Sequence, residues 1–181
     1  MEETIVRDAT SQDWLYIDSL RKKEGASLGF IPEVTYQSVL ERRVVAGRKR
    51  WKYQRLIVTV DNNELTGFCY YSLHDDLVTI IQIVVQPDAR RWYRAALMVG
   101  VVEGDAQKAA KYGITCRVAV DLESNFFWRA MGYEPVDTVV STYLNRKESK
   151  SKRPLFVYIK RWFPLFGDSH NMGILRVEGV A

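Results

Sequence analysis

The chain has 181 residues, a formal net charge of +4 and a sequence pI near 9.0. Hydrophobic residues make up 47% and charged residues 27%, which is typical of a folded globular protein and excludes a disordered chain. The length fits one domain, and the positive charge favours anionic partners without requiring a nucleic acid. The first residues, MEETIVRDATSQDW, do not resemble a signal peptide, and the longest apolar run, LVTIIQIVV, is too short to span a membrane.

Two cysteines, Cys69 and Cys116, each lie inside a strand-like run. They are too few and too far apart to form a zinc site, so we expect no metal. Free cysteines are usually buried and remain reduced inside cells. We therefore expect two buried thiols in a cytoplasmic protein without membrane contact.

The N-terminal third predicts one strand and two helices. Residues 3–9 read as a short strand, and Thr10 with Asp13 forms a capping-box pattern that begins a helix, which Gly25 ends. Pro32 suits a first helical position, and residues 32–47 predict a second helix that Gly47 closes.

Three strands are expected next, at 55–61, 65–73 and 77–86, with turn residues between them. They form an antiparallel meander. The third is almost entirely apolar, as a central strand covered on both faces would be.

Over residues 90–112 the apolar residues recur at alternating spacings of four and three, which predicts a long amphipathic helix that Gly113 terminates. A strand at 114–121, a short helix at 123–132 and strands at 133–142 and 154–162 complete the order. This order predicts an α/β fold, with a mixed sheet of six to seven strands flanked by about four helices. The domain spans residues 1–160, and residues 161–181 form a tail without a recognisable pattern.

The turn between the third meander strand and the long helix is a candidate anion site. The first backbone N–H groups of a helix are unpaired, and the helix dipole adds partial positive charge there. Arg90, Arg91 and Arg94 surround this turn. A diphosphate bound there would meet both amides and guanidinium groups.

The same turn resembles the acetyl-CoA loop of the GNAT superfamily of N-acyltransferases, with matches at Val85, Pro87, Arg90, Ala95 and Leu97. Residues 121–133, DLESNFFWRAMGY, are similar to that superfamily's short helix and its exit into the next strand. Both motifs occur in the family's order, and the resemblance covers about residues 3–160. It implies a GNAT fold and direct attack of an amine on the thioester of acetyl-CoA or another acyl-CoA, whose pantetheine arm enters between two splayed strands. The implied cofactor contacts are Ile83, Val84, Val85, Arg90, Arg91, Trp92, Tyr93, Arg94, Ala95, Ala96, Asn125 and Trp128.

Three positions depart from the family pattern. Arg91 and Tyr93 stand where glycines normally admit the pyrophosphate, and Trp128 stands where many relatives place a tyrosine that protonates the thiolate. Either the turn binds CoA with added arginine contacts, or the site is degenerate and the protein is a non-catalytic relative, such as a CoA-binding or nucleic-acid-binding module without turnover.

The candidate catalytic residues follow from the resemblance and from these departures. Tyr133, Tyr70, Tyr71 and Tyr143 are all candidates for the substitute acid, with Tyr133 taken as the catalytic candidate, and Gln82 on the central strand can hold a water that relays a proton. Asp121, together with Glu123, is the nearest acidic candidate for the base, although both suit ordinary surface positions. As a helix residue, Asn125 has no evident local reason to be asparagine, which favours a cofactor contact.

The acceptor is a small-molecule or macromolecular amine. Segments 42–55 and 146–153 are rich in basic residues, and 42–55 also carries aromatic rings, a pattern of nucleic-acid binding and also of an ordinary solvated surface. Both interpretations stay open, as does formation of a homodimer.

Overall fold

A computed structural model of the chain describes residues 4–90, 93–142 and 152–162. Its centre is a seven-stranded mixed sheet in the order β1-β2-β3-β4-β5-β7-β6, which confirms the predicted fold class. β4 and β5 pair in parallel, and the other neighbouring strands pair antiparallel. The strands are β1 (Thr4–Asp8), β2 (Gln54–Asp61), β3 (Glu64–Ser72), β4 (Leu77–Val85), β5 (Gly113–Ala119), β6 (Glu134–Thr142) and β7 (Lys152–Arg161).

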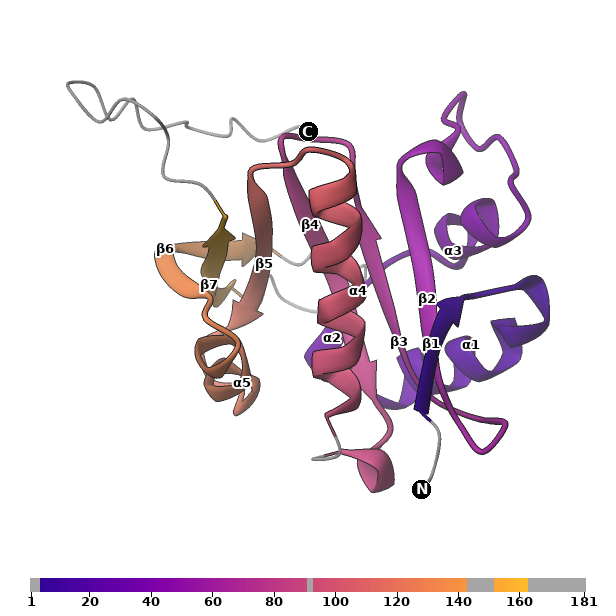
Figure 1. Cartoon of the computed structure of the whole chain (residues 1–181), viewed down its shortest axis with the longest axis horizontal. Coiled ribbons are helices and arrows are strands. Elements are labelled where there is room, and N and C mark those ends of the chain that lie inside the picture. Colours follow the sequence, from indigo (N-terminus) through magenta and orange to yellow (C-terminus); the bar gives the residue numbers. More distant parts are fainter. Residues whose placement is uncertain (1–3, 91–92, 143–151, 163–181) are drawn as a thin grey trace.

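Helices cover both faces of the sheet. α4 (Arg94–Lys108) runs across one face, as Figure 1 shows, and buries Met98, Val99 and Val102 against it together with α5 (Ser124–Ala130). On the other face, α1 (Trp14–Lys23) and α3 (Glu33–Leu40) bury a second cluster around Ile17 and Tyr36. The remaining elements are the single turn α2 (Gly25–Leu28) and the 3-10 turns η1 (Ser11–Asp13), η2 (Arg50–Lys52) and η3 (Pro87–Ala89). Within the described ranges, no helix has the length and hydropathy needed to cross a membrane.

The first helix begins as predicted, with a capping box between Thr10 and Asp13. Two helix ends differ from the prediction. α3 ends at Leu40 and not at Gly47, because Arg42 adopts a left-handed conformation (φ 52°) and Arg43 N–H returns to the Ser38 carbonyl. This is a Schellman end formed without glycine.

α4 ends in the same way. Ala110 has φ 51°, and Lys111 N–H bonds the Ala106 carbonyl, so the helix stops before Gly113. Gly113 instead lies inside β5, where a Cβ would collide with the Lys160 carbonyl oxygen on β7. Its role is close strand approach and not helix termination.

A β-bulge in β4 reverses the alternation of its side chains. Tyr71 pairs with Ile80 and Tyr70 with Gln82, which leaves Ile81 as an extra residue. Val78 and Ile80 pack on the α4 face, whereas Gln82 and Val84 face α1 and α3. The bulge therefore turns Gln82 toward the helices opposite α4.

Candidate functional site

β4 and β5 separate along their length. They pair only from Leu77–Ile80 to Gly113–Cys116, and β5 then continues beside β7. In the described part of the chain, Ile81–Val85 of β4 has β3 on one edge and no strand on the other. A free strand edge can pair with the amide groups of an extended ligand. Ile83, Val84 and Val85 lie on this free stretch.

The turn after β4 leads directly into α4, so the first helical amides follow the stretch of β4 that has no strand on its β5 side. We call the diverging stretch of β4 and β5 beyond Ile80 and Cys116 the slot. Tyr93 precedes the helix with φ 61° and is 82% exposed. This is the backbone conformation that glycine favours, and here tyrosine adopts it. Ala95 and Ala96 form the first turn of α4, while Arg91 and Trp92 lie outside the described residues.

We expect Tyr93→Gly to stabilise the protein. A left-handed conformation costs a non-glycine residue about 1–2 kcal/mol, and the added backbone entropy of glycine offsets about 0.5–1 kcal/mol of that. Little packing is lost because the ring is exposed. Thermal denaturation should show a higher midpoint, whereas the control Phe126→Gly, an exposed ring inside helix α5, should lower it. Equal destabilisation by both changes would contradict this account of Tyr93.

Arg94 supports the turn from inside. Its guanidinium forms an ion pair with Asp61 at the end of β2 and donates to the Ala89 carbonyl at 3.0 Å. Both side chains of the pair are at most 9% exposed. The expectation that Arg94 presents its charge to a diphosphate is therefore corrected: its guanidinium is enclosed by the protein and ties the start of α4 to β2.

Arg90 remains accessible at the turn, with its side chain 49% exposed. Its Nε donates to the Val85 carbonyl at 3.1 Å, and its Nη2 contacts the Glu24 carboxylate at 2.6 Å. Glu24 lies between α1 and α2. Among the described arginines of the turn, Arg90 is the one whose charge an anion in solvent can reach.

Gln82 is buried and its amide is bound by the protein. Nε2 donates to the carbonyls of Leu28 and Gly29, both at 3.0 Å, and Oε1 accepts from the Tyr36 hydroxyl. These contacts fix the end of α2 against the centre of the sheet. The structure thus gives Gln82 a positioning role beside the slot.

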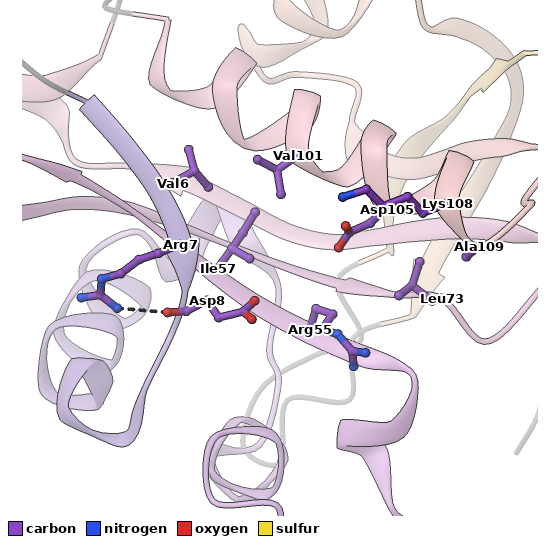
Figure 2. A pocket seen from close by; sticks show the side chains of 10 residues that line it. All are labelled: Val6, Arg7, Asp8, Arg55, Ile57, Leu73, Val101, Asp105, Lys108 and Ala109. Carbon is purple, nitrogen blue, oxygen red and sulfur yellow. Dashed lines mark hydrogen bonds between the residues drawn. The ribbon is translucent and has the colours of Figure 1, made fainter.

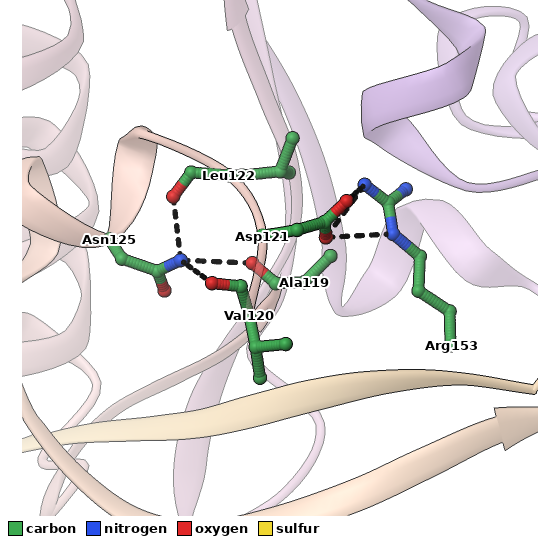
Figure 3. Close-up of polar contacts among 6 residues, drawn as sticks. All are labelled: Ala119, Val120, Asp121, Leu122, Asn125 and Arg153. Carbon is green, nitrogen blue, oxygen red and sulfur yellow. Dashed lines mark hydrogen bonds and ion pairs between the residues drawn. The ribbon is translucent and has the colours of Figure 1, made fainter.

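Asn125 fastens the loop between β5 and α5. Figure 3 shows its amide nitrogen directed at the carbonyls of Ala119, Val120 and Leu122, at 2.9, 3.2 and 2.6 Å. Its oxygen accepts from the Tyr158 hydroxyl at 3.1 Å. The expectation that Asn125 has no local reason to be asparagine is wrong, because these contacts use both ends of the amide.

Tyr133 and Trp128 are buried against one another, with ring centroids 5.0 Å apart. The Tyr133 hydroxyl is enclosed and makes no hydrogen bond of good geometry to the described residues. Burial, and next the Glu103 carboxylate, raise the pKa of Tyr133 well above its usual value, and the thiol of Cys116 also contributes. Tyr133 belongs to the same buried cluster as Cys116, the last β5 residue that pairs with β4.

Asp121 lies on the surface, with its side chain 64% exposed. Arg153 of β7 binds both of its oxygens at 3.0 Å, as Figure 3 also shows. Asp121 borders a hollow of about 290 Å³ at the end of β5. The hollow is lined by Val120, Asp121, Leu122, Glu123, Asn125, Phe126, Arg129 and Phe156.

The basic segment 42–55 is partly exposed. Arg42, Arg43 and Arg48 face solvent, whereas the rings of Trp51 and Tyr53 are half-buried. Tyr53 packs edge-on against His74, with centroids 4.7 Å apart. Of segment 146–153, all but the last two residues lie outside the described residues.

No protein-family profile and no curated protein sequence matches the chain. Solved structures do resemble it. NAA60 of Arabidopsis thaliana in complex with acetyl-CoA has a TM-score of 0.69 at 14% identity, covering 88% of this chain and 98% of that one. The ribosomal-protein-S18-alanine N-acetyltransferase of Escherichia coli has a TM-score of 0.67 at 12% identity, covering 93% and 99%. Ard1 of Thermoplasma volcanium has a TM-score of 0.68 at 10% identity, covering 89% and 99%.

These likenesses establish that the chain has the fold of the GNAT N-acetyltransferases, as the two sequence motifs predicted. Sequence reasoning missed three residues that shape the site: Glu24, Tyr36 and Asp61. Each acts through a partner at least 33 positions away in the chain, and nothing in the local sequence signals such a contact.

Proposed function

We propose that the protein is an acyl-CoA-dependent N-acyltransferase that transfers an acetyl or other acyl group to an amine. One observation carries the proposal: the stretch of β4 that has no strand on its β5 side leads, through a short turn, into the N-terminus of α4. A free strand edge suits the amides of pantetheine, and the helix N-terminus suits a diphosphate. The fold of NAA60, solved with acetyl-CoA, supports this combination.

The reaction is direct transfer. A neutral amine attacks the thioester carbonyl carbon, the carbon–sulfur bond breaks, and the departing thiolate takes a proton. We assign that proton to Tyr133, whose enclosed hydroxyl has no hydrogen-bond partner of good geometry among the described residues. The proton lost by the amine passes to water or to a carboxylate, for which Asp121 and Glu123 are the candidates.

Other residues prepare the site. Arg90 offers a guanidinium to the diphosphate, and Arg94 holds the turn in place through Asp61. Gln82 holds α2 beside the slot, where the acceptor amine would approach. The buried, unpaired thiols of Cys69 and Cys116 fit a reducing compartment such as the cytoplasm. Nucleic-acid binding through 42–55 and 146–153, and dimerisation, stay predictions.

Titration with acetyl-CoA tests the proposal. A ligand at one hundred times its Kd adds about 2.7 kcal/mol to the stability of the native state, so the thermal midpoint should rise by several degrees. Thiol release should then be followed on a panel of amines, with the protein omitted as the control. Binding with release supports the acyltransferase. Binding without release on any amine supports a CoA-binding protein without turnover, and no midpoint shift at millimolar acetyl-CoA overturns both.

A further inference from the structure

A second hollow lies at the opposite end of α4 from the acyl-CoA slot. It measures about 550 Å³, within the usual size of small-ligand pockets, and is bounded by β1, β2, the end of β3 and the C-terminal half of α4 (Figure 2). The slot begins at Arg94, whereas this hollow begins at Val101 and extends past the end of the helix. Its lining residues are Val6, Arg7, Asp8, Arg55, Ile57, Leu73, Val101, Asp105, Lys108 and Ala109.

The periodicities of the surrounding elements give the hollow an apolar floor and a charged rim. Alternation along β1 and β2 turns Val6 and Ile57 toward α4, with Asp8 and Arg55 beyond them on the same face. Val101, Asp105 and Lys108 follow at helical spacings of four and three, so they lie on one side of α4. The floor is therefore apolar near the middle of the sheet, and charge surrounds the mouth.

The charges of the rim are of both signs. Figure 2 shows the carboxylates of Asp8 and Asp105 on opposite walls, one from β1 and one from α4. Asp105 accepts from the Tyr71 hydroxyl at 2.6 Å, which fixes its orientation. The side chains of Asp8 and Lys108 make no hydrogen bond or ion pair with the residues that the structure describes. Arg7 binds the Asp13 carboxylate at 2.8 Å and donates to the backbone carbonyl of Asp8 at 3.0 Å (Figure 2), so its guanidinium contacts the main chain of Asp8 and not the Asp8 carboxylate.

We propose that this hollow binds a small zwitterion with an apolar body, of the chemical class of an aliphatic α-amino acid. The ammonium group lies between Asp8 and Asp105, the carboxylate is met by Lys108, and the hydrocarbon covers Val6, Ile57 and Val101. A simple anion would face the two carboxylates as well as Lys108 and Arg55, and a simple hydrocarbon would leave Asp8 and Lys108 without a charged partner among the described residues. The proposal concerns binding alone and holds whether or not the chain transfers acyl groups.

The test is calorimetric titration with L-leucine in the absence of any acyl-CoA. Isoamylamine, which lacks the carboxylate, and 4-methylpentanoate, which lacks the ammonium, are titrated in parallel. Leucine should bind more tightly than either. Asp8→Asn and Asp105→Asn should each weaken leucine about ten- to a hundredfold, the range expected for a lost hydrogen bond to a charged group.

The variants keep the fold and localise the site. Asparagine at 105 still accepts from Tyr71, and Asp75→Asn, an equal loss of charge in the exposed turn between β3 and β4, is the matched control. Lys108→Ala should weaken leucine but leave isoamylamine unchanged. Leucine binding that survives both aspartate changes would place the ligand elsewhere and overturn the proposal. Equal binding of leucine and isoamylamine, an unchanged affinity in Lys108→Ala, or no heat with leucine would each also overturn it.

Discussion

Replacement of Arg94 by methionine is expected to lower the free energy of unfolding by about 3–5 kcal/mol, because it leaves the buried Asp61 carboxylate without its counter-charge. Urea denaturation measures the loss. The double variant Arg94→Met with Asp61→Asn should recover part of it, since no unpaired charge then remains inside.

The matched control is Arg90→Met at the same turn. The Arg90 side chain is half exposed, and its contact with Glu24 should contribute only about 0–1 kcal/mol to stability. Acetyl-CoA binding should show the opposite pattern to stability. Arg90→Met should weaken binding more than Arg94→Met does, because Arg90 is the arginine assigned to the diphosphate. An Arg94→Met variant that has normal stability but fails to bind acetyl-CoA would contradict this account and make Arg94 a diphosphate contact, as the sequence predicts.

Tyr133→Phe is expected to reduce kcat about 100-fold or more, the usual contribution of a positioned general acid, with little change in KM. Its stability should be unchanged or slightly higher. The hydroxyl is buried without a well-formed hydrogen bond, so its removal breaks no contact and relieves an unsatisfied polar group. Acyl-transfer kinetics and thermal denaturation of the same variant measure both quantities.

Tyr71→Phe provides the opposite pattern. The Tyr71 hydroxyl donates to the Asp105 carboxylate at 2.6 Å, and its loss should cost about 1.5–3 kcal/mol of stability while kcat is retained. A Tyr133→Phe variant with normal kcat would remove Tyr133 from the mechanism and leave the thiolate to be protonated by water.

The sequence predicts those parts of the fold that local chemistry determines. The apolar strand at 77–86, the capping box at Thr10 and the strand-to-helix turn at Val85 all depend on neighbouring residues, and the structure has each of them. The ends of α3 and α4 were misplaced because Arg42 and Ala110 adopt left-handed conformations that usually indicate glycine.

The interior of the candidate site depends on contacts between distant segments. Arg90 reaches Glu24 across 66 positions, and Gln82 reaches Leu28 across 54. In a sequence, a cluster of arginines at the start of a helix indicates a phosphate site. The sequence does not tell whether the charges of those arginines face solvent or a buried carboxylate. Only the arrangement of the sheet decides that Arg94 faces Asp61.

The bulge at Ile81 decides which face of the sheet the following residues of β4 occupy. If β4 paired regularly with Ile81 kept, Ile81 would lie opposite Tyr70, and Gln82 would enter the apolar layer beneath α4 while Val84 exchanged faces as well. The amide that anchors Leu28 and Gly29 would be lost in the same step. The one extra residue therefore lets a single strand place Ile80 in the apolar layer under α4 and Gln82 in the polar contacts with α2 on the other face.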